Sequence, residues 1–288
     1  MKSLLLIAGI WLSLTSWNAL LAQDDLLKGL EPEPTNNIAL ATFKGTRLIN
    51  FQTLEVPGKR TLDFRISHRF GAFNSGFNNF FGLDGGASIR IGLDYSFDGR
   101  FAFGIGRTSY EKMLDGFVKY RLLRQQEPRG MPISITLLAS MYSTLQKDTL
   151  KYAQVSNRFS YAYQLMIGRK FSDRFSLQIA PTMIHYNLAQ HISDKNDVYI
   201  LAAATRFKFT KRMALTLEYG WRPLEYTRQK YYDSLGAGVD IETGGHVFQF
   251  FVTNSFGLLE NQFLPHTEFK WSNMGIRLGF NISRVFTL

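Results

Sequence analysis

The sequence predicts an all-β protein, a single antiparallel transmembrane β-barrel of about twelve strands, preceded by a cleaved signal peptide. Three observations lead to this prediction: an apolar leader, alternation of bulky with small or polar residues along most of the chain, and connections that are alternately long and very short. A tilted strand crosses a membrane with about 9–11 residues, and most of the alternating segments reach that length. We therefore divide the chain into a signal peptide (1–22), a periplasmic lead-in (23–58) and the barrel (59–288).

The leader has the features of a secretory signal peptide. Lys2 is its one charge, an apolar run extends from Leu4 to about Leu14, and the small residue Ala22 precedes the expected cut. The apolar run is short for a membrane-spanning helix. The chain has no cysteine, which excludes disulfides, a lipid-modified N-terminus and thiolate chemistry. An exported chain meets little nucleic acid, so its net charge of +10 points to membrane surfaces and anionic solutes.

Alternation is clearest in "GASIRIGLDYSFDGRFAFGIGRTS" (Gly86 to Ser109). Ile, Leu, Tyr and Phe fill one face of the two strands, while Ser, Arg, Gly, Asp and Ala fill the other. A soluble β-sandwich, the alternative fold, would bury the bulky face and expose the polar one to water. A barrel in lipid turns the bulky face outward and keeps the small and charged residues inside. Aromatic residues near both ends of the strands favour the barrel.

The connections sort into two classes. Those after the second, fourth and later even strands are short ("DG", "QQEPRG", "SD", "TK", "TGG"), and the others are mostly long. This is the pattern of tight periplasmic turns and longer outer loops, and an even number of strands places both ends of the barrel on the periplasmic side. The predicted strands are 60–71, 87–97, 100–109, 113–124, 131–145, 157–171, 174–188, 197–210, 213–222, 234–243, 245–254 and 274–287.

Twelve charged residues fall on the inward face. They are Arg65, Arg69, Arg90, Asp94, Lys119, Arg121, Arg206, Lys208, Glu218, Asp240, Glu242 and Arg277. Because basic residues outnumber carboxylates among them, one interpretation is a basic constriction that admits anions. The other is an interior filled by arginine–carboxylate pairs that hold the wall together, since a twelve-stranded barrel is narrow. Glycines on the same face leave room for the arginines.

Four phrases carry a resemblance to a known family: "FKGTRLINFQTLEVPGK", "LDFRISHRFG", "IRIGLDYSFDGRFAFGIGRTSYEKMLDGFVKYRLL" and "DIETGGHVFQFFVTNS". Together they resemble an uncharacterised outer-membrane β-barrel family of Bacteroidota, known as a domain of unknown function. The resemblance implies an outer-membrane location and a barrel. It implies no activity, substrate or catalytic residue.

The residues indicate no catalytic, metal or cofactor site. His185 and His191 lack a third ligand at a metal-site spacing, and Ser67 and His68, as neighbours on one strand, face opposite sides. Two long loops, "FNSGFNNFFGLDGG" and "FGLLENQFLPHTEFKW", are rich in Phe, Asn and Gly. They either fold inward as a plug, which we favour slightly, or dock a partner protein.

The resulting hypothesis is a non-enzymatic, porin-like channel of the cell outer membrane, passing small solutes, anions among them, by diffusion. The alternative is a non-conducting structural or assembly barrel that docks other envelope proteins through its outer loops. Expected partners are outer-membrane lipid and lipopolysaccharide, an envelope protein, and the barrel-assembly machinery, whose insertion signal the final "LGFNISRVFTL" resembles. No cofactor and no nucleic acid are expected.

Overall fold

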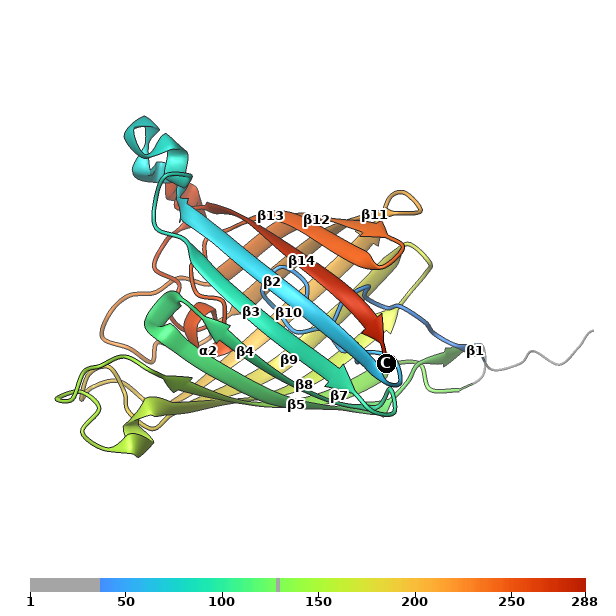
Figure 1. The fold of residues 1–288 in the computed structure, drawn as a ribbon, viewed down its shortest axis with the longest axis horizontal. Coiled ribbons are helices and arrows are strands. Elements are labelled where there is room, and N and C mark those ends of the chain that lie inside the picture. Colours follow the sequence, from blue (N-terminus) through green and yellow to red (C-terminus); the bar gives the residue numbers. More distant parts are fainter. Residues whose placement is uncertain (1–36, 128–129) are drawn as a thin grey trace, which may run out of the picture.

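Twelve strands close into one antiparallel barrel in the computed structural model, which describes residues 37–127 and 130–288 (Figure 1). They follow chain order around the wall, and β14 closes it against β2. The strands are β2 (Thr61–Ala72), β3 (Ser88–Ser96), β4 (Phe101–Thr108), β5 (Met113–Leu123), β7 (Ser134–Thr144), β8 (Phe159–Lys170), β9 (Phe175–Tyr186), β10 (Asp197–Lys208), β11 (Met213–Trp221), β12 (Ser234–Thr243), β13 (His246–Thr253) and β14 (Arg277–Thr287). The twelve predicted strands are confirmed, each within a few residues. The predicted signal peptide (1–22) lies outside the described residues.

The predicted alternation determines which side chains enter the barrel. Along β3, Ser88, Arg90 and Asp94 are buried while Ile89 and Ile91 are exposed on the outer wall. The same period of two runs through the other strands, because successive side chains of a strand point to opposite faces of the sheet. The bulky face therefore lies outside and the polar face lies in the lumen, as the sequence predicted.

Three of the short turns share one local cause. Asp98, Ser172 and Thr210 each begin a turn, and each side-chain oxygen accepts hydrogen bonds from the backbone N–H groups two and three residues later, at 2.7–3.2 Å. In the first of these turns Gly99 supplies a φ of +79°, which glycine adopts without steric cost. These turns form one end of the barrel, here called the turn end, and the longer connections form the loop end.

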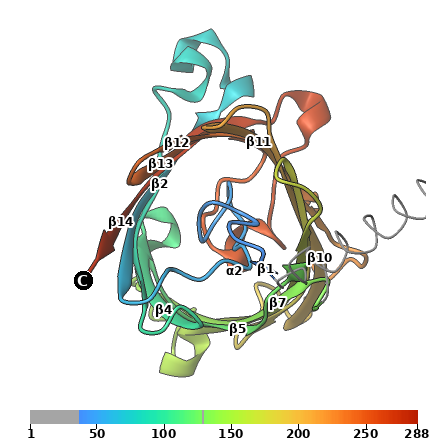
Figure 2. The same cartoon turned by 90° about the vertical axis from the view of Figure 1, so that its right-hand side faces the viewer.

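Two chain segments occupy the lumen (Figure 2). Residues 43–56, here called the inner hairpin, run inside the barrel and reverse where Leu48 N donates to Phe51 O at 2.9 Å and Thr53 N to Thr46 O at 2.9 Å. Residues 255–267 of the β13–β14 connection, here called the inner loop, fold inward and contain the short helix α2 (Glu260–Phe263).

The inner hairpin corrects the expectation of a periplasmic lead-in for this part of the chain. The expectation treated residues 23–58 as a segment outside the barrel, whereas residues 43–56 are almost entirely buried inside it. The physical reason is that the inward face offers many hydrogen-bonding side chains, which a narrow interior leaves unsatisfied unless a polar chain fills it. Before the hairpin, β1 (Asn37–Ile38) pairs with β6 (Gln126–Glu127) at the turn end.

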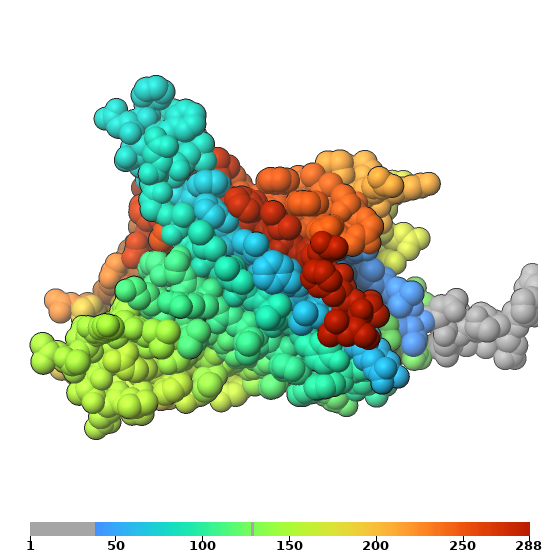
Figure 3. All heavy atoms as spheres, viewed as in Figure 1, coloured from blue at the N-terminus to red at the C-terminus, as the bar shows by residue number. Residues whose placement is uncertain are grey.

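The two aromatic loops differ from one another. The β13–β14 connection folds inward, as favoured, and its Leu259 and Phe263 are buried. The β2–β3 connection instead projects from the loop end (Figure 3). It contains the 3-10 turns η1 (Phe73–Ser75) and η2 (Phe77–Gly82), and Phe77 is 76% exposed. None of the helices that the structure describes is long and apolar enough to cross a membrane.

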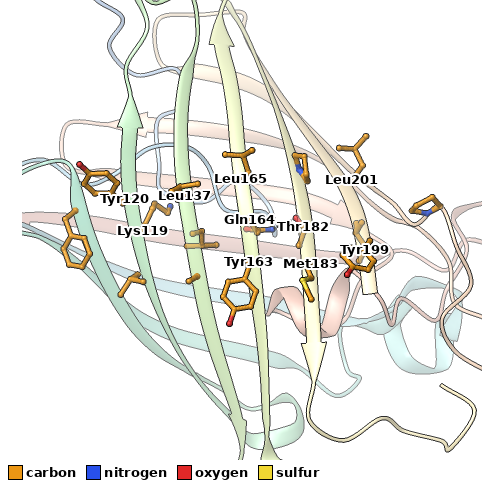
Figure 4. A pocket seen from close by; sticks show the side chains of 17 residues that line it. Lys119, Tyr120, Leu137, Tyr163, Gln164, Leu165, Thr182, Met183, Tyr199 and Leu201 are labelled. Atoms are coloured by element: carbon orange, nitrogen blue, oxygen red, sulfur yellow. Dashed lines mark hydrogen bonds between the residues drawn. The ribbon is translucent and has the colours of Figure 1, made fainter. Parts of the chain in front are cut away.

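An apolar groove of about 670 Å³ crosses the outside of β5, β7, β8, β9 and β10 (Figure 4). Outward side chains such as Tyr163, Leu165 and Tyr199 line it. Beneath it, the β8–β9 pairing skips from Gln164↔Thr182 to Ile167↔Ile179. The gap arises because Pro181 has no N–H to donate to β8.

Candidate functional site

The tip of the inner hairpin is held by three polar side chains of the wall. The Glu218 carboxylate on β11 accepts hydrogen bonds from Asn50 N at 2.9 Å and from Phe51 N at 3.0 Å. Arg69 on β2 donates to Ile49 O at 2.7 Å and to Asn50 Oδ1 at 2.8 Å. Asn281 on β14 donates to Ile49 O at 2.9 Å. Charged partners make these hydrogen bonds stronger than neutral ones.

The two legs of the hairpin are held mainly through their own backbone. Lys119 Nζ donates to three carbonyl oxygens, of Thr46 at 3.3 Å, Thr53 at 3.0 Å and Glu55 at 3.2 Å. Arg121 donates to Glu55 Oε2 and to Val56 O, both at 3.2 Å. Because backbone carbonyls carry only partial charges, the hairpin does not neutralise the charge of Lys119, whereas the carboxylate of Glu55 balances that of Arg121.

Further side chains of the wall complete the attachment of the hairpin. Gln178 on β9 accepts from Leu54 N at 2.7 Å and donates to Gln52 O at 2.9 Å, while Thr136 on β7 donates to Leu54 O at 2.8 Å. Thr46 Oγ1 donates to Asp94 at 3.1 Å and to Asp63 at 3.2 Å. Side chains therefore replace the ladder bonds that a segment outside the sheet does not make.

Other charges pair within the wall itself. Arg90 donates twice to Asp115, at 2.9 and 2.6 Å, and both side chains are buried. Arg206 pairs with Glu242, which also lies 3.4 Å from Lys44 Nζ. A Cβ added at Gly92 or Gly106 would collide with the Arg90 guanidinium. The inward glycines at these two positions thus make room for an arginine, as the sequence analysis inferred.

The predicted inward charges occupy four kinds of place. Arg69, Asp94, Lys119, Arg121 and Glu218 contact the inner hairpin, and Arg90 and Arg206 pair within the wall. Arg65 donates to Gln249 at 3.1 Å, and Asp240 accepts from Gln249 at 3.0 Å. Arg277 lies at the loop end, and Lys208 and Glu242 are half-buried near the turn end. Arginine–carboxylate pairs are thus present in the interior, and the basic constriction that admits anions stays a prediction.

Sequence reasoning missed several members of this network. Asp63 and Asp115 share the inward parity of Arg65 and Lys119, so the alternation alone could have identified them. Gln178, Gln249 and Asn281 also have inward parity but carry no charge, so a search for inward charges does not identify them. Arg47 and Glu260 gave no signal, because they lie in segments without periodicity.

One side of the interior is apolar. Met166, Ala180 and Ile200, on β8, β9 and β10, face inward and are buried in one cluster with Leu54 of the inner hairpin and Phe263 of the inner loop. Phe51 and Phe263 stack with their ring centroids 5.4 Å apart. The inward faces of β8–β10 therefore combine apolar residues with mostly uncharged polar ones such as Gln164 and Gln178, whereas the charges lie mostly on the other strands. Burial of this apolar surface stabilises both inner segments.

The loop end contains a polar pocket of about 200 Å³ above the inner loop, here called the outer-mouth pocket. It is lined by residues of four loops, including Tyr110, Tyr231 and His266. Burial, together with the nearby Arg222 cation, lowers the pKa of His266 to about 4. Burial, and then Glu111, raises the pKa of Tyr110 to about 12. In the part of the chain that the structure describes, no cluster of three His, Asp or Glu side chains is placed to hold a metal ion.

Comparisons with known proteins agree with this architecture. The sequence model of one family, "Membrane bound beta barrel domain (DUF5777)", matches residues 43–286, a range that begins at the inner hairpin. No curated protein matches the chain in sequence.

Several solved structures resemble the chain. "NanC porin structure in rhombohedral crystal form" has a TM-score of 0.50 at 8% identity, covering 79% of this chain and 99% of that one. "KdgM porin" has a TM-score of 0.47 at 12% identity, covering 78% and 99%. The COG4313 outer membrane channel from Pseudomonas putida F1 has a TM-score of 0.45 at 14% identity, covering 89% and 100%. At 8% identity the first likeness shows the fold alone, and the two weaker ones add no argument.

Proposed function

We propose that this chain, which belongs to the DUF5777 family of membrane-bound β-barrel domains, is an outer-membrane channel for small solutes. Its lumen is closed here by the inner hairpin and the inner loop. Solutes pass by diffusion, and the chain catalyses no reaction. Lipid and lipopolysaccharide surround its apolar outer wall. A Bacteroidota origin, and insertion by the barrel-assembly machinery through β14, remain predictions.

One observation carries the proposal: wall cations bind the backbone of a segment that is not part of the wall. Lys119 and Arg69 donate to carbonyl oxygens of the inner hairpin rather than to wall carboxylates. The hairpin can therefore leave without breaking a strand pairing. Its departure exposes the cations together with Glu218 and Asp94, and basic residues outnumber carboxylates over the inward face as a whole. A positive lumen raises the local concentration of anions, so the open channel favours small anions.

Single-channel conductance in a planar bilayer tests the proposal. We compare the wild type with three variants: deletion of residues 43–57, replacement of residues 257–265 by a short Gly-Ser linker, and both changes together. We expect brief openings from the wild type and a steady, anion-selective conductance once both segments are removed. Lys119→Glu in the doubly altered barrel should reduce the anion preference. A folded, doubly altered barrel that stays sealed would exclude the channel.

A structural or docking barrel is the second candidate, and the projecting β2–β3 connection favours it. Phe77 and Phe80 are 76% and 51% exposed, and Phe80 and Phe81 adopt left-handed backbone conformations with φ of +42° and +53°. Residues without a Cβ penalty normally occupy that region, so the loop holds its phenylalanines outward at some conformational cost. Loss of an envelope-protein partner from the Phe77→Ser/Phe80→Ser variant, with conductance unchanged, would support this candidate.

A further inference from the structure

The outer-mouth pocket contains an arginine that has no partner among the described residues. Arg277 is 7% exposed, and its guanidinium carbon lies 4.4 Å from the ring centroid of Phe256 and 4.8 Å from that of Phe269. Its side chain makes no hydrogen bond and no ion pair with any residue that the structure describes, and its Nε is buried unsatisfied. A guanidinium whose Nε is buried without an acceptor carries a desolvation cost. Two aromatic faces compensate for only part of that cost.

The same pocket also contains a carboxylate that has no partner in the part of the chain that the structure describes. Glu268 is exposed at its rim and forms no hydrogen bond or ion pair within the described ranges of the chain. The Glu268 carboxylate lies beyond ion-pair distance of the Arg277 guanidinium, although both residues line the pocket. The second carboxylate of the pocket, Glu111, already accepts a hydrogen bond from Gln262 at 3.0 Å. The pocket thus presents one free cation and one free anion that are separated from each other.

These charges restrict the chemistry of a ligand. A simple anion would satisfy Arg277 but would be repelled by Glu268 and Glu111, and a simple cation would leave Arg277 unpaired. A molecule that carries both charges satisfies both free groups. A guanidinium recognises a carboxylate through two parallel hydrogen bonds, and an ammonium group is a compact partner for a carboxylate. The hydroxyl of Tyr110 stays protonated and available as a further donor, because its pKa is raised to about 12, first by burial.

The size of the pocket restricts the ligand further. About 200 Å³ is available, and a water molecule takes about 30 Å³ in the liquid, so the space suits a molecule of roughly six heavy atoms. The pocket lies where the loops after β4, β9, β11 and β13 meet. A solute entering the barrel from the loop end therefore encounters this pocket before the inner loop.

We propose that the outer-mouth pocket binds a small zwitterion, the chemistry of a free amino acid, with the carboxylate of the ligand on Arg277 and its ammonium group at Glu268. The assignment names a class of solute for the proposed channel, and its relevance to transport rests on that proposed function. Binding of the ligand to the pocket does not itself require that the barrel conducts.

Isothermal titration of the intact, detergent-solubilised chain tests the assignment. The probes are L-alanine, acetate and methylammonium at one ionic strength. We expect L-alanine to bind at least tenfold more tightly than either single-charge probe. Arg277→Gln should lower the affinity for alanine at least tenfold, while Arg212→Gln, at an exposed turn-end arginine, should leave it unchanged.

Glu268→Gln keeps the test decisive if the Arg277 variant folds poorly, because Glu268 is exposed and holds no structural contact. It should weaken alanine binding and leave acetate binding equal or stronger. Equal binding of alanine and acetate, or alanine binding that neither variant changes, would overturn the assignment. A chain that binds alanine but never conducts would support the pocket and contradict the channel. A chain that conducts without binding alanine would overturn the pocket alone.

Discussion

Arg47 of the inner hairpin and Glu260 of α2 form an ion pair inside the barrel, with 3.3 Å between Arg47 Nη1 and Glu260 Oε1. Both side chains are nearly inaccessible, and the other carboxylate oxygen of Glu260 accepts from the Tyr142 hydroxyl at 2.7 Å. One partner belongs to the segment that precedes the first barrel strand and the other to the last loop. The pair therefore connects the two segments that fill the lumen, so that displacement of one weakens the other.

Removing either partner of this pair should loosen the hairpin. Arg47→Met leaves Glu260 without its cationic partner, and Glu260→Gln leaves Arg47 as an unpaired buried charge. Each change should cost about 3–5 kcal/mol. Hydrogen exchange of the peptide covering residues 43–57 measures this cost as a loss of protection. The double variant should lose less than the sum of the two, whereas strictly additive losses would show that the pair is not coupled.

The sequence predicted the wall well and the contents of the lumen poorly, for a physical reason. The wall is periodic: the inward parity of Arg90 and the outward parity of Ile91 follow from a side-chain period of two, and turn residues such as Asp98 fix the strand ends. Residues 43–56 have no period, and their position depends on hydrogen bonds to Glu218 and Lys119, far away in the chain. Contacts of that kind leave no local pattern in a single sequence.

The candidate site was predictable to the same degree. Parity placed Arg69 and Lys119 inward, but it could not tell whether they face solvent, a wall carboxylate or another segment. The lead-in looked periplasmic because nothing in its composition marks a chain that will be buried. The inward glycines were the one early sign of how the interior is packed. Gly92 and Gly106 leave room that the Arg90 guanidinium occupies.

Lys119→Met should open the channel more often. The variant keeps an unbranched side chain but removes three hydrogen bonds to the carbonyls of the hairpin. A hydrogen bond to a charged group contributes about 1.5–3 kcal/mol, and 1.4 kcal/mol is a tenfold change in an equilibrium constant. The open probability in a planar bilayer should rise at least about tenfold. Lys211→Met, at an exposed turn-end lysine, is the matched control, and equal effects of the two would refute the role of Lys119.

Gly106→Val should destabilise the wall without changing any charge. Its Cβ would enter the space of the Arg90 guanidinium and disturb the ion pair with Asp115. Overpacking of this kind costs about 1–3 kcal/mol. Urea unfolding followed by tryptophan fluorescence should show the loss. Gly86→Ala meets no atom within 4 Å and should keep the wild-type midpoint; a Gly106→Val midpoint equal to it would contradict the packing argument.

Acid should loosen the inner loop through His266. Burial, and then the Arg222 cation, lowers the pKa of this histidine from 6.5 to about 4, so the inward state of the loop favours the neutral ring. Its contribution to stability is complete above pH 6.5 and is lost as the pH falls towards 4, because the withdrawn loop binds the proton more tightly. The rate of proteolytic cleavage within residues 255–267 should therefore rise between pH 6.5 and 4. His266→Gln cannot be protonated and should remove that rise, whereas an identical pH profile for the variant would assign the acid response to another group.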